Sequence, residues 1–157
     1  MKIELENVKP AEIEKRSFEI ITEELGDTHL IPGTEPIVKR CIHTSADFDY
    51  AKTMTYSAHA VGIAKKLIQN GADIVTDTNM ALAGVNKKEL AKYGGKAHCF
   101  MAEEEVAKIA KERGVTRAAV SMEKAAQIEK PVIFAIGNAP TALIELYEMI
   151  KLSLIHI

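Results

Sequence analysis

Ala72-Asp73-Ile74-Val75-Thr76-Asp77 is the stretch that decides the fold of this chain. It is short and rich in β-branched residues, and a glycine precedes it, so it predicts a strand buried on both faces of a sheet. Residues 96–101 and 131–136 predict two further strands. Helices are predicted between and after the strands, at residues 87–93, 103–113, 116–128 and 140–151. Because strands that alternate with helices form βαβ units, the pattern predicts a parallel sheet covered by helices.

The part of the chain ahead of this strand predicts helices alone. Pro10 and acidic residues open a helix that Gly26 ends, and shorter helical runs follow at residues 37–42 and 57–68. The whole pattern predicts an α/β fold with three layers, α/β/α, around a flavodoxin-like parallel sheet. A chain of 157 residues is long enough for one domain, which we expect to span residues 1–151.

Composition narrows the class of protein. Apolar residues make up 47% and charged residues 27% of the chain, as in ordinary globular proteins, and the net charge of −2 gives no electrostatic case for nucleic-acid binding. The sequence lacks both an apolar run of about 18 residues and a signal peptide, so we expect a cytoplasmic protein without a membrane partner. Cys41 and Cys99 form neither a disulfide framework nor a metal-binding CxxC pair.

Two loops fall where an open α/β sheet usually binds its ligand. Right-handed crossovers gather the carboxyl ends of parallel strands along one edge of the sheet. Asp77-Thr78-Asn79-Met80 and Gly137-Asn138-Ala139-Pro140 follow predicted strands and therefore belong to that edge. The second loop is also typical of a simple strand-to-helix turn, with an Asn cap and a proline in the first helical turn.

A single histidine stands out in the stretch Lys39-Arg40-Cys41-Ile42-His43-Thr44-Ser45-Ala46-Asp47-Phe48. Histidine can hold and release a proton near neutrality because its unperturbed pKa is about 6.5. A histidine among mixed residues can equally be a structural hydrogen-bonding group. Cys41 and His43 do not indicate a metal site, since nothing nearby completes a tetrahedral ligand set. His59 and His98, within a predicted helix and strand, are expected to be structural.

Five segments, taken together and in order, resemble the precorrin-8X methylmutase family, which includes the cobalt-precorrin-8 enzymes of corrinoid biosynthesis. They are Arg16-Ser17-Phe18, Arg40-Cys41-Ile42-His43-Thr44, Asp77-Thr78-Asn79-Met80-Ala81 with Gly84-Val85, Thr116-Arg117-Ala118-Ala119, and Phe134-Ala135-Ile136-Gly137-Asn138-Ala139-Pro140-Thr141-Ala142-Leu143.

The resemblance implies an isomerase that moves a methyl group from C-11 to C-12 of a tetrapyrrole, precorrin-8X or cobalt-precorrin-8. Such a shift needs no metal or redox cofactor from the protein, so we expect none. A positioned general acid is worth roughly 10²–10⁴-fold in rate. By resemblance, His43 is the proton donor and acceptor, and Ser17 and Arg40 contact the substrate. Thr44, Met80, Arg117 and Asn138 are further candidates for substrate binding.

The substrate of this family carries carboxylate arms, for which arginines and helix N-termini are suitable partners. Arginine occurs at only four positions, 16, 40, 113 and 117, against sixteen lysines. Asn138 and the amides around Ala139 and Thr141 could hold another carboxylate. Arg117 could instead be a surface charge, and Met80 would otherwise be a core residue.

Alternatives remain open for the whole protein. The resemblance implies a homodimer, and it does not separate the cobalt-containing substrate from the metal-free one. A corrinoid-binding protein without turnover is the alternative function. A nucleotide-binding domain is disfavoured because neither GxGxxG nor GxxxxGK[ST] occurs. Relatives continue beyond this length, so we expect a sheet that is incomplete at the C-terminus, and we interpret residues 152–157 as a non-native tail.

Overall fold

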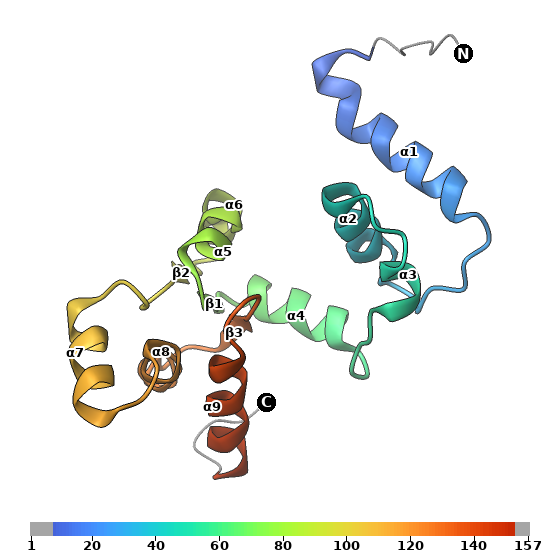
Figure 1. Cartoon of the computed structure of the whole chain (residues 1–157). Helices are drawn as coiled ribbons and strands as arrows, with labels where there is room; N and C mark the ends of the chain where they lie inside the picture. The colour runs from blue at the N-terminus through green and yellow to red at the C-terminus, as the bar shows by residue number, and fades with distance from the viewer. Residues whose placement is uncertain (1–7, 153–157) are drawn as a thin grey trace, which may run out of the picture. The chain divides into compact units, whose positions relative to one another are not determined.

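The computed structural model describes residues 8–152, so residues 153–157 of the expected tail lie outside the described residues. The chain divides into two compact units, Met1–Gly62 and Ile63–Ile157 (Figure 1). The single domain expected over residues 1–151 stays a prediction.

The first unit is helical. A turn of 3₁₀-helix, η1 (Pro10–Glu12), leads into α1 (Ile13–Leu25), which ends where Gly26 adopts φ 56° and donates its N–H to the carbonyl of Thr22. The next helices are α2 (Glu35–Ser45) and α3 (Tyr50–Thr53). α2 is longer than the predicted run at residues 37–42, because Pro36 is accommodated in its first turn and the helix continues to a left-handed Ala46.

The core of the first unit lies where α1 packs on α2. Ile21 of α1 and Val38 and Ile42 of α2 are buried, with Leu25 and Phe48 among the side chains packed against them. Burial of such a side chain contributes roughly 1.5–3 kcal/mol, so these three contacts fix the rotation of one helix against the other. That rotation decides which polar side chains of α1 meet α2.

The second unit contains the sheet. α4 (Ala60–Gln69), which spans the boundary of the two units, leads to β1 (Asp73–Thr76). β2 (Ala97–His98) and β3 (Val132–Ala135) both pair with β1 in parallel, so the strand order is β2-β1-β3. Ile74 lies opposite Ala97 on one side and Ile133 on the other. The open parallel sheet predicted from the sequence is confirmed.

Helices connect the strands and flank the sheet. α5 (Asn79–Gly84) and α6 (Lys87–Lys92) lie between β1 and β2, α7 (Glu104–Arg113) and α8 (Arg117–Ala125) between β2 and β3, and α9 (Pro140–Lys151) follows β3. Figure 1 shows α5 and α6 on one side of the strands and α8 and α9 on the other. The main core lies on the second side, where seven residues are buried: Val75, Ala118, Met122, Ala125, Ala142, Leu146 and Met149.

Three local expectations were wrong. β2 has only two residues instead of the predicted 96–101. At its end, the carbonyl of His98 accepts a hydrogen bond from the Thr76 hydroxyl. α5 was not predicted; it is too short for an apolar period, and Thr78 caps it by accepting from the amide of Ala81. His59 lies in a turn before α4, at φ 60°, and not within the helix.

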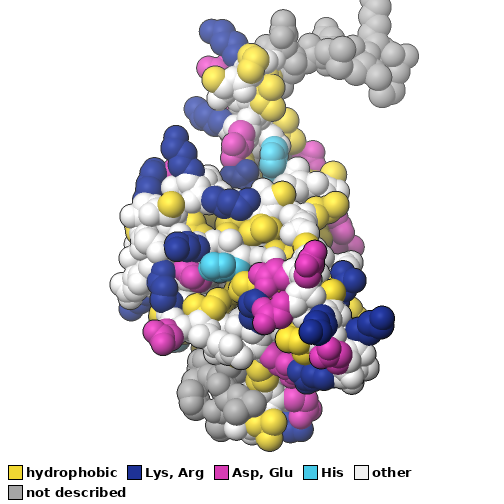
Figure 2. Space-filling model, turned by 90° about the vertical axis from the view of Figure 1, so that its left-hand side faces the viewer, with side chains coloured by type: hydrophobic (Ala, Val, Ile, Leu, Met, Phe, Trp, Pro, Cys, Tyr) yellow, Lys and Arg dark blue, Asp and Glu magenta, His cyan; other side chains and the backbone are white. Residues whose placement is uncertain are grey.

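Ion pairs join the segments around α7 and α8. Lys124 contacts Glu103 at 2.6 Å and Glu105 at 2.9 Å, and Arg113 makes two contacts with Glu123, at 2.5 and 2.7 Å. Figure 2 shows side chains of both charge signs mixed over the face in view. Exposed pairs of this kind contribute at most about 1 kcal/mol each, so apolar burial supplies most of the stability here.

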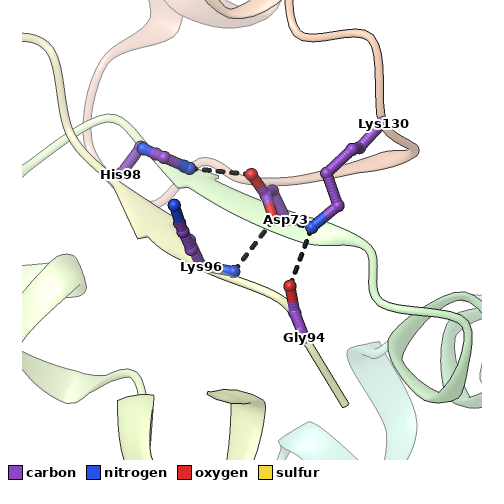
Figure 3. Close-up of polar contacts among 5 residues, drawn as sticks. All are labelled: Asp73, Gly94, Lys96, His98 and Lys130. Atoms are coloured by element: carbon purple, nitrogen blue, oxygen red, sulfur yellow. Dashed lines mark hydrogen bonds and ion pairs between the residues drawn. The ribbon is translucent and has the colours of Figure 1, made fainter.

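A buried aspartate links the three strands near their amino ends (Figure 3). Asp73 opens β1, is only 4% exposed, and accepts hydrogen bonds of 2.9 Å from the Lys96 amide and from the Lys130 ammonium. His98 Nε2 lies 2.9 Å from its other oxygen, and the Lys130 ammonium also donates to the Gly94 carbonyl at 2.8 Å. Desolvation by itself would raise the pKa of Asp73, but the contacts with Lys130, His98 and Lys96 outweigh it and lower the pKa to about 2.

This network predicts acid sensitivity. Because the pKa of Asp73 is lower in the folded chain than its ordinary value of 3.8, its contribution to stability is complete above that value and is lost as the pH falls from about 4 to 2. The loss is on the order of 2 kcal/mol. Urea unfolding between pH 2 and 6 measures it: Asp73→Asn should flatten the acid limb, and Glu89→Gln, which removes an exposed carboxylate, should leave the limb steep. An equally steep limb in Asp73→Asn would contradict the assignment.

Gly95 is required by close packing. A Cβ at this position would lie 2.4 Å from the carbonyl oxygen of Ala72 and 2.8 Å from the Leu90 side chain. We expect Gly95→Ala to lower the free energy of unfolding by about 1–3 kcal/mol, because the backbone must move. Gly62→Ala is the matched control: a Cβ there meets nothing within 4 Å, and the change should stabilise α4 by up to about 1 kcal/mol. Denaturant unfolding of both variants compares them directly, and equal stabilities would refute the packing argument.

Candidate functional site

The first unit brings His43 of α2 against two side chains of α1. Ser17 Oγ lies 2.8 Å from His43 Nδ1, and the Phe18 ring stacks on the imidazole with centroids 5.4 Å apart and planes 19° apart. Ser17 lies one helical turn before the buried Ile21, and His43 follows the buried Ile42. The apolar contact between the helices therefore aligns the polar pair.

The Ser17 contact assigns different tasks to the two nitrogens of His43. Nδ1 is engaged by Ser17, whereas Nε2 has no hydrogen-bond partner among residues 8–152. A hydroxyl can accept from an imidazole N–H as well as donate to it. With Nδ1–H donating to Ser17, the ring can hold or release a proton at Nε2 without breaking this contact. The arrangement suits a proton donor and acceptor.

A hollow of about 420 Å³ borders this pair within the first unit. Its volume falls in the range of about 300–1,000 Å³ that small-molecule sites occupy. Apolar side chains form much of its lining, and polar groups come from both helices. The lining residues are Val8, Ile13, Arg16, Ser17, Ile20, Ile21, Glu24, Ile42, His43, Ala46 and Phe48.

Arg40 and Thr44 complete the candidates in this unit. The Arg40 guanidinium lies over the Phe18 ring, 4.9 Å from its centroid, and Nη2 donates to Glu14 at 2.5 Å. The Thr44 hydroxyl donates within its own helix to the carbonyls of Arg40 and Cys41, and its oxygen retains the capacity to accept. The structure thus gathers Ser17, Arg40, His43 and Thr44 on two packed helices.

The other three candidates lie in the second unit. Met80, at the start of α5, is 85% exposed, so the alternative that it belongs to the core is wrong. Arg117 is the first residue of α8, is exposed, and makes no ion pair within the described part of the chain. The Thr116 hydroxyl donates to that of Thr141 at 3.1 Å, which holds the start of α8 beside the first turn of α9.

Asp77 lies in the same region, and the sequence pattern predicted no role for it. Its carboxylate is fully buried at the end of β1 and accepts from the amides of Gly137 at 3.2 Å, Asn138 at 2.7 Å and Ala139 at 2.7 Å. Desolvation opposes the charge, but these three N–H donors outweigh it and lower the pKa of Asp77. The sequence signal for this role was an acidic residue directly after a buried strand. The hydrogen-bond partners of Asp77 could not be predicted, because they depend on β3 lying beside β1.

This contact corrects one expectation about the loop before α9. The amide of Ala139 was expected to help hold a substrate carboxylate, but it already binds the carboxylate of Asp77. The side chain of Asn138 remains exposed and is still a candidate for substrate contact. Asp77 therefore shapes the loop and makes the amides of Gly137, Asn138 and Ala139 unavailable to a ligand.

Between residues 8 and 152, no group of three or more His, Cys, Asp and Glu side chains is arranged to hold a metal ion. None of the helices within that range is long and apolar enough to cross a membrane.

Comparisons with known proteins agree on one family. A family model described as precorrin-8X methylmutase matches residues 12–156. A cobalt-precorrin-8 methylmutase of Priestia megaterium is 43% identical over 144 residues, which cover 92% of this chain and 64% of that protein. The cobalt-precorrin-8 methylmutase of Salmonella typhimurium is 39% identical over 89% of this chain and 70% of its own length. The chain thus spans about two thirds of these relatives.

A solved structure shows the same fold. The precorrin-8X methylmutase from Thermus thermophilus superposes with a TM-score of 0.80 at 35% identity, over 90% of this chain and 69% of that one.

The Asp77 contact predicts a large loss of stability on neutralisation. Asp77→Asn removes the charge, leaves one oxygen to accept and turns an NH₂ group toward at least one of the three N–H donors, so we expect the free energy of unfolding to fall by about 2–4 kcal/mol. Asp27→Asn, at an exposed loop position without a hydrogen bond from its side chain among the described residues, should change it by less than about 0.5 kcal/mol. Urea unfolding at pH 7 compares the two, and equal stabilities would show that the loop does not depend on Asp77.

Proposed function

Because this chain belongs to the precorrin-8X methylmutase family, we propose that it is an isomerase that moves a methyl group from C-11 to C-12 of precorrin-8X or cobalt-precorrin-8. The observation that carries the proposal is the 2.8 Å contact between Ser17 and His43 Nδ1, with Nε2 left without a partner in the described residues. The similarity to two cobalt-precorrin-8 methylmutases supports the substrate class.

His43 acts as the proton donor and acceptor in this proposal. Nε2 gives a proton to a nitrogen of the conjugated ring, the methyl group leaves C-11 and bonds to C-12, and Nε2 then recovers the proton. Ser17 holds the imidazole at Nδ1 throughout, and the stacked Phe18 ring restricts its rotation. A positioned group of this kind contributes roughly 10²–10⁴-fold to the rate.

The remaining candidates bind the rim of the substrate. Arg40 and Thr44 supply a guanidinium and a hydroxyl beside His43 in the first unit. In the second unit, Arg117 offers a charge that no described residue neutralises, and Met80 and Asn138 offer exposed side chains. The exposed guanidinium of Arg117 suits a carboxylate arm, since arginine can bind a carboxylate through two parallel hydrogen bonds.

The same proposal includes a cytoplasmic homodimer. Leu143, Ile144 and Tyr147 of α9 are 55–61% exposed and form an apolar helix face, of the sort that associating proteins bury.

The decisive measurement is the visible absorption of the chain mixed with each of the two substrates and followed over time. Methyl migration changes the conjugation, so turnover shifts the bands. His43→Ala should slow this shift by roughly 10²–10⁴-fold, with binding changed only a few-fold. His29→Ala, at an exposed position, is the matched control and should keep the wild-type rate. A His43→Ala variant that turns over at the wild-type rate would refute the catalytic assignment. Wild-type chain that binds without any band shift would favour the alternative, a corrinoid-binding protein.

A further inference from the structure

Glu14 forms an ion pair with Arg40, the arginine to which the proposed function assigns substrate binding. In the first unit its carboxylate oxygen Oε1 accepts from Arg40 Nη2 at 2.5 Å, and Arg40 is the only partner of this carboxylate among residues 8–152. We propose that Glu14 is an internal stand-in for a substrate carboxylate, which holds Arg40 in place in the empty site and gives way to a carboxylate arm on binding. This inference rests on the proposed function, because it assigns Arg40 to the substrate.

The contact is placed beside the reacting group. Glu14 and Phe18 lie four residues apart on α1, so both face the same side of that helix. The Arg40 guanidinium is 4.9 Å from the Phe18 ring centroid, and the same ring stacks on His43 at 5.4 Å. A carboxylate that replaced that of Glu14 would therefore attach the rim of the substrate next to the imidazole.

The geometry also makes the contact replaceable. Both side chains are more than half exposed, 55% for Arg40 and 60% for Glu14, so water and salt weaken their attraction. Only one guanidinium nitrogen is used, whereas arginine binds a carboxylate best through two. A substrate arm free to approach along the two-nitrogen edge gains the second hydrogen bond that Glu14 lacks.

The stand-in has a consequence for specificity. A ligand with a carboxylate at this position exchanges one anion for another on Arg40, and the guanidinium remains neutralised. A ligand with a neutral arm cannot displace Glu14 in this way and forgoes the charge-assisted hydrogen bonds. Glu14 therefore makes the site selective for a charged arm.

Binding titrations of the complete chain test this proposal. The probe is the corrin product of the proposed isomerisation, which binds without further turnover, and its visible bands report occupancy at constant pH and 0.15 M salt. Glu14→Gln removes the competing anion, and we expect it to tighten binding by about two- to fivefold. Glu35→Gln is the matched control, because Glu35 pairs with Lys39 in the same unit and its loss changes the net charge equally. Any general effect of charge on an anionic probe appears in both variants.

The role of Arg40 is tested by a second pair of variants. Arg40→Ala should weaken binding, and in that background Glu14→Gln should have no more effect than Glu35→Gln. In one outcome, Arg40→Ala weakens binding, but the affinity of Glu14→Gln is lower than that of wild type or equal to that of Glu35→Gln. The stand-in proposal is then overturned, and the proposed function survives. If Arg40→Ala leaves binding unchanged, the substrate role of Arg40 fails and the stand-in fails with it. A folded wild-type chain that does not bind the product overturns both proposals.

Discussion

The central strand β1 begins with one buried carboxylate, that of Asp73, and is followed directly by another, that of Asp77, and a buried charge left without hydrogen bonds is strongly destabilising. Asp73 receives its donors from Lys96, directly before β2, from His98 within β2, and from Lys130, two residues before β3. Asp77 receives three amides from the loop after β3. The two acids thus bind both neighbours of β1, and the parallel sheet satisfies them only in the order β2-β1-β3. The order of the strands and the hydrogen bonding of the two buried carboxylates therefore depend on each other.

The two ends of β1 have different consequences. At the amino end, side chains of Lys130 and His98 meet Asp73, and the contact stabilises the sheet. At the carboxyl end, Asp77 accepts hydrogen bonds from backbone amides that could otherwise bind an external anion. This edge, between β1 and β3, is where an open α/β sheet usually binds its ligand. Because the carboxylate of Asp77 already binds the amides of Gly137, Asn138 and Ala139, those three amides are not available to a ligand at this edge.

In the first unit, apolar packing between two helices positions the polar side chains of the candidate site. Ile21, Val38 and Ile42 hold α1 against α2, and the same rotation brings Ser17 to one nitrogen of His43 and Phe18 to its ring. The second nitrogen is left for proton transfer in the proposed reaction. Arg40 and His43 both contact the Phe18 ring, so the proposed carboxylate-binding residue and the proposed proton donor share one aromatic neighbour. Glu14 completes the set by pairing with Arg40 from one turn earlier on α1.

Much of the fold could be predicted because it depends on local chemistry. β-branched runs gave β1 and β3 nearly to the residue, Gly26 ended α1, and Pro140 opened α9 as expected. The family followed from short segments in order, and the comparisons confirmed it. By contrast, α5 is too short to give a periodic signal and begins at a cap on Thr78, and β2 is shorter than predicted and ends where the Thr76 side chain contacts the His98 carbonyl.

By itself, the sequence determined most of the helices and strands, the parallel α/β class, the family and the identity of the candidate residues, because residue type and spacing encode these locally. The tertiary structure alone decided the strand order, the capture of the loop amides by Asp77, the pairing of Ser17 with His43 and the contact of Glu14 with Arg40. The last two pairs lie 26 residues apart and Asp77 lies 62 residues from Ala139. Contacts over such separations follow from how the helices and strands pack, which no local pattern specifies.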